Sequence, residues 1–294
     1  MKELFSILRI HIVSIAVGGA LVFGWLLTGR YLWWIALIGG FDWLLINLAN
    51  RVSDLREDLA NAIPGSERVA RRQTGTMLAW AALLAGSLAV TVPLFPELTG
   101  WRLFMQAVGL VYSFRLVPFP GGRRRLKNVY LLKNLLSGLG FVTSCFLYPL
   151  AHVGFAAQIA WPGIVLLMLY FVPFEQSYEI LYDLRDLDGD RRAGVPTYPL
   201  VHGVATTHTI IHALLGVSLA VIFLGFVFGF YGVKETLMGC GPVLQFFLLR
   251  PILRRGPTTA DCIVVTFLGT AMLLAYLACT ALWLAAGLPE NVYL

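Results

Sequence analysis

Two clusters of acidic residues interrupt a sequence that is otherwise largely apolar. The first is SDLREDLAN at 53–61 and the second is YDLRDLDGDRRAG at 182–194, and both contain the triplet Asp-Leu-Arg. Neither contains His or Cys, which are typical of zinc and copper sites, whereas carboxylate and amide oxygens suit Mg²⁺. Proteins usually hold Mg²⁺ by one or two carboxylates and leave its other positions to substrate phosphate oxygens. The clusters therefore indicate a site for a metal-bound diphosphate.

The spacing within each cluster is helical. On a helix, the polar residues of the first cluster and those just before it fall on one face. These residues are Asn47, Asn50, Arg51, Asp54, Asp58 and Asn61. In the second cluster and the segment just before it, acidic residues recur every three or four positions, so they form a row along one stripe of a helix. This row consists of Glu175, Glu179, Asp183, Asp186 and Asp190.

A row of like charges destabilises a helix, and Glu175 and Glu179 lie inside an apolar segment, where a charge is costly to bury. Something cationic must compensate for this cost. A local ion pair or a protonated side chain would explain a lone intramembrane glutamate as well as a functional site would. Two facing rows of carboxylates favour a site, because intramembrane ionisable groups usually mark one.

The composition is that of an integral membrane protein. Of the 294 residues, 58% are hydrophobic and 13% are charged, and the mean hydropathy is +0.77. The apolar runs lack period-2 alternation, so we expect helices rather than a β-barrel. The predicted fold class is all-α, with residues 1–294 forming a single polytopic domain of about nine transmembrane helices around a central cavity. The expected spans are 9–28, 31–50, 76–97, 101–117, 131–152, 157–182, 204–230, 235–250 and 262–286.

The positions of the basic residues predict the orientation. In this topology, Arg30, Arg102 and Lys234 lie at one membrane face, and all the others of the 22 Lys and Arg residues lie at or near the opposite face. By the positive-inside rule, the N-terminus is cytoplasmic, and so are the loops next to both acidic clusters. Topology and anionic lipid headgroups explain the net charge of +6, so we expect no nucleic acid partner.

An arginine-rich segment, GGRRRLK at 121–127, follows the fourth expected span. It would suit a patch that binds lipid headgroups, a positively charged cytoplasmic loop, or a lid over a diphosphate. The sequence leaves these three interpretations open.

The two clusters resemble the aspartate motifs of the UbiA superfamily of intramembrane prenyltransferases. Residues 50–58 are similar to its N-D-x-x-D-x-x-x-D motif, with Asn50, Asp54 and Asp58 at matching positions. Residues 183–199 are similar to its D-x-x-D-x-x-G-D-R-x-x-G-x-x-T-x-P motif. The segments VYSF (111–114) and RLKNVYLLKNLLSG (125–138) resemble the family's Tyr-Ser, Lys and Lys-Asn segment, so the resemblance covers nearly the whole chain.

The chain departs from the family pattern in three places. Arg51 stands at the second position of the first motif, where the family has an aspartate. The insert RLVPFPGGRRR (115–125) separates Tyr112 from Lys127. After Asp58, the position of the family's arginine is open among three candidates, which are Arg68, Arg71 and Arg72.

The resemblance implies Mg²⁺-dependent transfer of a prenyl group from an allylic isoprenoid diphosphate to a lipid, quinone-precursor or aromatic acceptor within the membrane. It implies that two Mg²⁺ ions are held by the catalytic residues Asp54, Asp58, Asp186 and Asp190, together with Asn50 and Asp183. The residues expected to bind the diphosphate are Arg51, Arg68, Arg71, Arg72, Lys127 and Arg191. The expected wall around the allylic cation consists of Tyr112, Tyr178 and Tyr182.

Two other functions are compatible with the sequence. In a terpene cyclase of the same superfamily, a double bond of the substrate itself would capture the allylic cation, and a cyclic hydrocarbon would form without an acceptor. In a membrane transporter, the acidic stripe would line a pathway, and no diphosphate would be released.

Overall fold

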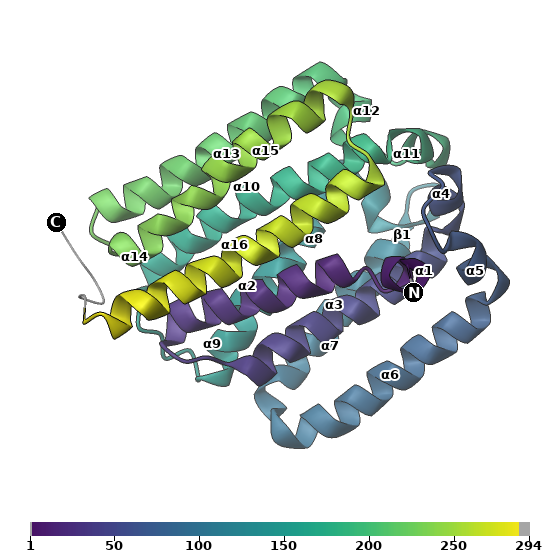
Figure 1. Ribbon diagram of the computed structural model, residues 1–294. Coiled ribbons are helices and arrows are strands. Elements are labelled where there is room, and N and C mark those ends of the chain that lie inside the picture. Colours follow the sequence, from purple (N-terminus) through teal and green to yellow (C-terminus); the bar gives the residue numbers. More distant parts are fainter. Residues whose placement is uncertain (1, 288–294) are drawn as a thin grey trace.

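The chain folds almost entirely into helices. The computed structural model describes residues 2–287, and Figure 1 shows its long helices lying side by side in a bundle. The long helices are α2 (Ile10–Thr28), α3 (Trp33–Ser53), α6 (Gln73–Leu94), α7 (Thr99–Ser113), α8 (Leu132–Val142), α10 (Trp161–Arg185), α13 (Val204–Val227), α15 (Cys240–Arg255) and α16 (Thr259–Ala285).

Shorter elements connect or extend these helices. The short helices are α1 (Lys2–Ile7), α4 (Leu55–Ala60), α5 (Ser66–Arg71), α9 (Tyr148–His152), α11 (Leu187–Ala193), α12 (Tyr198–His202) and α14 (Val233–Thr236). Single turns of other helix types are η1 (Pro96–Leu98), η2 (Leu126–Asn128), η3 (Thr143–Leu147, a π-helix) and η4 (Leu237–Gly239). The strands β1 (Val117–Phe119) and β2 (Gly122–Arg124) form an antiparallel hairpin.

The all-α class is confirmed, and most of the expected spans are present. Among residues 2–287, eight helical segments are long and apolar enough to cross a membrane, with α8 to α9 and α14 to α15 each counted as one segment. The remaining expected span, 101–117, is occupied by α7, which has 15 residues. At 1.5 Å per residue α7 is roughly 22 Å long, less than a hydrocarbon core of roughly 30 Å. The total of nine spans therefore stays a prediction.

Helix α2 lies in the middle of the packing. Its second half, from Gly18 to Thr28, is buried throughout, and α2 packs against α3, α16, η3 and α9. Close approach depends on small residues, as at Gly19, where an added Cβ would lie 2.9 Å from the Cys145 sulfur. Helix α2 thus forms much of the interior, and this interior supports the elements that carry the acidic clusters.

A buried ion pair holds α7 and the peripheral helix α6 to the bundle. The Arg102 guanidinium binds both carboxylate oxygens of Asp42, at 2.9 and 2.7 Å, and the two side chains are 1% and 0% exposed. Tyr148 donates to the same carboxylate at 2.8 Å. Arg102 also donates to Ser87, at 3.1 Å, and to Thr91, both on α6. No residue of α6 is buried, so these bonds add to its packing against α3.

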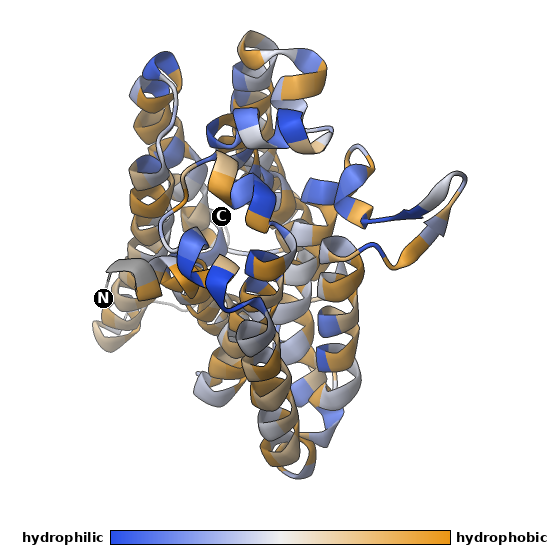
Figure 2. Ribbon diagram, turned by 90° about the vertical axis from the view of Figure 1, so that its right-hand side faces the viewer, coloured by the Kyte–Doolittle hydropathy of each residue, from blue (hydrophilic) through white to orange (hydrophobic). Residues whose placement is uncertain are grey.

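The polar short elements gather at one end of the bundle. Figure 1 places α4, α5, α11, α12 and the β-hairpin there, and Figure 2, which looks onto that side, shows strongly hydrophilic segments among them. The two acidic clusters lie on α3 and α4 and on α10 and α11. The fold thus brings both clusters to the same end of the molecule.

Candidate metal and diphosphate site

A one-residue break interrupts each helix that carries an acidic cluster. Helix α3 ends at Ser53 and α4 begins at Leu55, so Asp54 lies at the break, with its N–H bonded to the Asn50 carbonyl at 2.9 Å. Helix α10 ends at Arg185 and α11 begins at Leu187, which puts Asp186 at the equivalent position. Each break keeps the chain close to helical geometry, so the predicted spacing of the carboxylates is largely retained.

The two broken helices face each other through α4 and α11. The Gly189 N–H donates to the Asn61 side-chain oxygen at 2.9 Å, and the Asn61 amide donates to Asp186 at 3.3 Å. A Cβ added at Gly189 would lie 2.3 Å from the Asn61 amide nitrogen, so only glycine permits this approach. This contact fixes the distance between the two rows of carboxylates.

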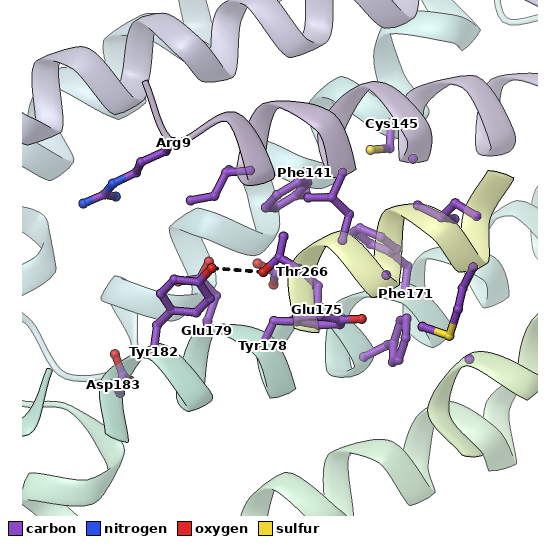
Figure 3. A pocket seen from close by; sticks show the side chains of 18 of the residues that line it. Arg9, Phe141, Cys145, Phe171, Glu175, Tyr178, Glu179, Tyr182, Asp183 and Thr266 are labelled. Atoms are coloured by element: carbon purple, nitrogen blue, oxygen red, sulfur yellow. Dashed lines mark hydrogen bonds between the residues drawn. The ribbon is translucent and has the colours of Figure 1, made fainter. Parts of the chain in front are cut away.

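A cavity of about 440 Å³ lies between the two rows. Among the residues that line it are all the expected metal ligands, Lys127 and all three expected aromatic residues: Asn50, Asp54, Asp58, Asp183, Asp186, Asp190, Lys127, Tyr112, Tyr178 and Tyr182. Figure 3 shows Arg9, Tyr182 and Asp183 toward one end of the cavity and Cys145 and Phe171 toward the other. The cavity therefore has a charged end and an apolar, aromatic end.

On the first wall, carboxylates pair with basic side chains. The Lys127 ammonium lies 2.5 Å from both Asp54 Oδ1 and Glu57 Oε2. Arg125 lies 2.8 Å from Glu57 Oε1 and 3.4 Å from Asp54 Oδ1. Arg51 pairs with Asp58 at 2.6 Å. Each carboxylate on this wall thus has a cationic partner.

The second wall repeats this arrangement. The Lys133 ammonium bridges Asp183 and Asp190, at 2.7 and 3.0 Å. The Asn134 amide donates to the other oxygen of Asp183 at 3.1 Å, and Arg185 pairs with Asp186. A single ammonium thus bridges two carboxylates that lie seven residues apart, on α10 and α11.

Two carboxyl groups that lie outside the membrane-spanning helices, Asp54 and Asp190, have pKa values shifted in opposite directions. Burial by itself raises the pKa of Asp54, but the charge and hydrogen bond of Lys127 together with the charges of Arg9 and Arg125 more than compensate, and the pKa lies below its ordinary value. Burial raises the pKa of Asp190 to about 6, since the Lys133 charge offsets only part of the desolvation. Asp190 therefore takes up a proton at a higher pH than Asp54 does.

The donor set suits Mg²⁺ completed by substrate oxygens. Within residues 2–287, no three His, Cys, Asp or Glu side chains are grouped so that they could hold a metal ion on their own. The two walls instead offer carboxylate oxygens and the amide of Asn50, the hard donors that Mg²⁺ prefers. The carboxylates of both walls would suit Mg²⁺, with substrate phosphate oxygens completing its ligands.

The arginines expected at the diphosphate do not line the cavity. Arg51 is 4% exposed and also donates to the Ser6 carbonyl at 2.5 Å, so its guanidinium is held between Asp58 and α1. The others are exposed, three of them on or just after α5 and one on α11 beside Asp188: Arg68, Arg71, Arg72 and Arg191. None of these five residues lines the cavity.

Several basic and acidic residues at the site had no expected role. The cavity is also lined by Lys133, Glu57, Arg9 and Arg185. Arg185 belongs to the second Asp-Leu-Arg triplet, but nothing in the sequence gives a reason to place it at the site. Lys133 belongs to the Lys-Asn pair of the segment 125–138, which is the one sequence signal that could have identified it. Arg9 lies at the junction of α1 and α2, a junction that the sequence does not predict.

A second, smaller cavity of about 90 Å³ adjoins the first. The two cavities share Arg9, Asn50, Tyr112 and Glu179. Asn47 lines only the smaller one; it is 3% exposed, and its amide nitrogen has no hydrogen-bond partner in the described part of the chain. An unpaired buried amide is costly, so a polar group entering this cavity would find a ready donor.

Known proteins share this sequence pattern in part. A family model described as the UbiA prenyltransferase family matches residues 12–268. The digeranylgeranylglyceryl phosphate synthase of Haloquadratum walsbyi is 32% identical over 90 residues, which cover 31% of this chain and 30% of that protein. The synthase of the same name from Methanobrevibacter smithii is 26% identical over 160 residues, which cover 52% of this chain and 53% of that protein. The chain thus spans at most about half the length of these curated relatives.

Solved structures share the fold over nearly the whole chain. A UbiA homologue from Archaeoglobus fulgidus bound to GPP and Mg²⁺ has a TM-score of 0.69 at 16% identity, and the match covers 93% of this chain and 97% of that one. The same homologue bound to DMAPP and Mg²⁺ has a TM-score of 0.70 at 16% identity, with the same coverage. At this low identity the likeness concerns the arrangement of the helices.

Proposed function

The chain belongs to the UbiA prenyltransferase family, and from this premise we propose that it is a multi-pass membrane enzyme that transfers a prenyl group from an isoprenyl diphosphate to a lipid acceptor. One observation carries the proposal: both rows of carboxylates and a set of aromatic and apolar side chains line the same cavity. An isoprenyl diphosphate has a charged head that binds metal and a long apolar tail. The cavity offers a matching environment to each part.

The charged end of the cavity would bind the diphosphate together with Mg²⁺, for which we propose two ions. The proposed metal ligands are the expected ones: Asn50, Asp54, Asp58, Asp183, Asp186 and Asp190. Bound Mg²⁺ would stabilise the negative charge that develops on the diphosphate as its bond to the allylic carbon breaks. We assign Lys127 and Lys133, one at each wall, to donate hydrogen bonds to the phosphate oxygens.

The aromatic side chains of the cavity would shield the allylic cation. Tyr182 lies toward the charged end, and Tyr112, Tyr178 and Phe171 also line the cavity. Their ring faces can stabilise a positive charge while they exclude water. Tyr182 is held in place by a hydrogen bond with the Thr266 hydroxyl at 3.0 Å, drawn in Figure 3. Exclusion of water prevents hydrolysis of the cation, so that the acceptor captures it.

The smaller cavity is the proposed place for the nucleophilic end of the acceptor. The name of the two curated relatives favours a glyceryl phosphate lipid over a quinone precursor or an aromatic compound. Asn47 would donate to the acceptor, and Glu179, which lines both cavities, is placed to receive the proton that the acceptor oxygen loses. The Ser137 hydroxyl lies 2.9 Å from Glu179 and orients that carboxylate.

The charged end of the cavity is proposed to face the cytoplasm. The acidic clusters share their end of the bundle with α5, α11 and the β-hairpin, all of which carry exposed arginines. By the positive-inside rule, a membrane protein keeps such an end on the cytoplasmic side. A water-soluble diphosphate head could then reach the site from the cytoplasm while its tail enters the membrane.

A diphosphate-release assay tests the proposal. Protein reconstituted in nanodiscs is given geranylgeranyl diphosphate and Mg²⁺, with and without a membrane lipid extract as acceptor. We expect diphosphate release that the extract stimulates and that a chelator abolishes, with a prenylated lipid as the product. A cyclic hydrocarbon formed without the extract would establish a cyclase instead, and no release with any chain length would favour a transporter.

Replacing Asn47 by leucine separates the acceptor cavity from the diphosphate site. Loss of one hydrogen bond to a buried acceptor is worth about 1–3 kcal/mol, so we expect KM for the lipid acceptor to rise by about tenfold or more. KM for the isoprenyl diphosphate should stay unchanged, since Asn47 does not line the larger cavity. Steady-state kinetics with each substrate varied in turn measure both constants, and equal changes in both would contradict the assignment.

A further inference from the structure

The segment between α7 and α8 forms a β-hairpin that stands clear of the bundle. Its strands pair with Val117 opposite Arg124 and Phe119 opposite Gly122. Gly121 and Gly122 make the turn with φ of 90° and 123°, a region that favours glycine. Figure 2 shows the hairpin extending sideways from the polar end, with hydrophobic residues in the strand that leaves α7 and hydrophilic ones in the returning strand. Isolated two-stranded hairpins are marginally stable in water, so a surface is needed to hold this one.

The arginines of the hairpin divide into one that points inward and three that point outward. Arg125 is 9% exposed and binds Glu57 and the Asn128 side chain, at 2.8 and 2.9 Å. Arg115, Arg123 and Arg124 are exposed, and no carboxylate of the described residues pairs with them. The sequence has no acidic residue between Glu97 and Glu175 that could neutralise them locally. The hairpin is therefore a strongly positive projection.

The surroundings of the hairpin place it at the boundary between hydrocarbon and headgroups. Leu131 and Leu135, where α8 enters its membrane span, are 41% and 51% exposed, so the lipid-facing surface begins within a few residues of β2. Tyr130 packs edge-on against Tyr198, with ring centroids 5.8 Å apart. Tyrosines at this depth are typical of the membrane interface. Leu116, just before β1, is 48% exposed.

The structure also argues against the hairpin being a lid over the diphosphate. No residue from 115 to 124 lines either cavity, whereas Lys127, just after the hairpin, lines the larger one. An extended strand covers roughly 3.3 Å per residue, so the tip lies well away from the base that contacts the site. The outward arginines thus lie away from both cavities.

We propose that the β1–β2 hairpin binds the phosphate groups of anionic phospholipids. Arg115, Arg123 and Arg124 are the headgroup ligands, and Leu116, Val117 and Phe119 contact the upper acyl chains. Basic residues near an anionic membrane attract it electrostatically, and an adjacent apolar group adds burial. This inference does not depend on the proposed transferase activity, because it concerns only the hairpin and the lipids around the protein.

Hydrogen exchange in nanodiscs tests the proposal without an activity assay. The amides of residues 116–125 are compared in nanodiscs of phosphatidylcholine alone and of phosphatidylcholine mixed with phosphatidylglycerol. We expect slower exchange in the mixed nanodiscs and loss of most of that protection at high salt. Each arginine should contribute about fivefold to the affinity for the anionic surface, so the double variant Arg123→Gln/Arg124→Gln should lose about 25-fold in affinity and most of the protection.

Two control variants test whether the protection depends on the charge and the position of the hairpin arginines. Arg123→Lys/Arg124→Lys retains the charge and should retain most of the protection. Arg254→Gln removes an exposed arginine from the end of α15 and should leave the hairpin unchanged. Equal exchange in both kinds of nanodisc would overturn the proposal. Protection by free inorganic diphosphate in nanodiscs of phosphatidylcholine alone would also overturn it, because the hairpin would then bind soluble phosphates rather than lipid.

Discussion

Replacing Asp186 by alanine is expected to lower the rate of Mg²⁺-dependent diphosphate release by about a thousandfold. Asp186 lies at the break between α10 and α11, lines the main cavity, and is fixed there by Asn61 across the site. Its loss removes one proposed metal ligand from the second wall and leaves the negative charge of the departing diphosphate less compensated. The measurement is the initial rate of diphosphate release at saturating isoprenyl diphosphate, over a range of Mg²⁺ concentrations.

Asp188→Ala is the matched control for this variant. Asp188 is two residues away, in the first turn of α11, but its side chain is 73% exposed and does not line the cavity. We expect its activity to stay within about twofold of the wild type, because surface substitutions of this kind change little. If both variants lost activity equally, the effect would come from α11 as a whole, and the metal-ligand role of Asp186 would be contradicted.

Replacing Arg102 by alanine is expected to destabilise the protein by about 3–5 kcal/mol, because it leaves the carboxylate of Asp42 buried without its charged partner. The same change removes the bonds from α7 to Ser87 and Thr91, so α6 should detach first. Thermal unfolding in detergent measures the loss of stability, and hydrogen exchange of residues 73–94 reports on α6. Unchanged exchange of α6 would show that this helix is held by other contacts.

The double variant Asp42→Leu/Arg102→Met tests whether the loss of stability comes from the unpaired charge of Asp42. Removing both partners of a buried ion pair commonly costs far less than removing one, since no charge is left unpaired. We expect this double variant to recover most of the stability that Arg102→Ala loses. Arg30→Ala, at an exposed arginine between α2 and α3, should unfold like the wild type.

The carboxylates of the site could be predicted because helical spacing is a local property. Asp183, Asp186 and Asp190 share one stripe in the sequence, and all three line the cavity, since the break at Asp186 disturbs the helix by only one residue. The long helices could be predicted for the same reason, because each apolar run specifies its own span. The shorter α7 was expected as a helix, but its length falls below that of a clear span.

The cationic partners could not be predicted, because they depend on which helices pack together. Lys133 reaches Asp190 across 57 positions of sequence, and Lys127 reaches Asp54 across 73. Arg51 shares a helical face with Asp54, yet it turns toward the Ser6 carbonyl, since α1 folds back against the end of α3. Nothing in residues 50–58 indicates that contact. The hairpin likewise could not be predicted, because the sequence shows residues 115–125 only as an arginine-rich insert.

The breaks at Asp54 and Asp186 also decide how little charge the backbone presents to the substrate. An α-helix carries a partial negative charge at its C-terminal end and a partial positive charge at its N-terminal end. At each break a long helix ends and a short one begins within two residues, α4 after α3 and α11 after α10, so the two partial charges largely offset each other. The affinity of the cavity for an anion is therefore set by its side chains and by the cations that accompany the diphosphate, and not by the direction of its helices.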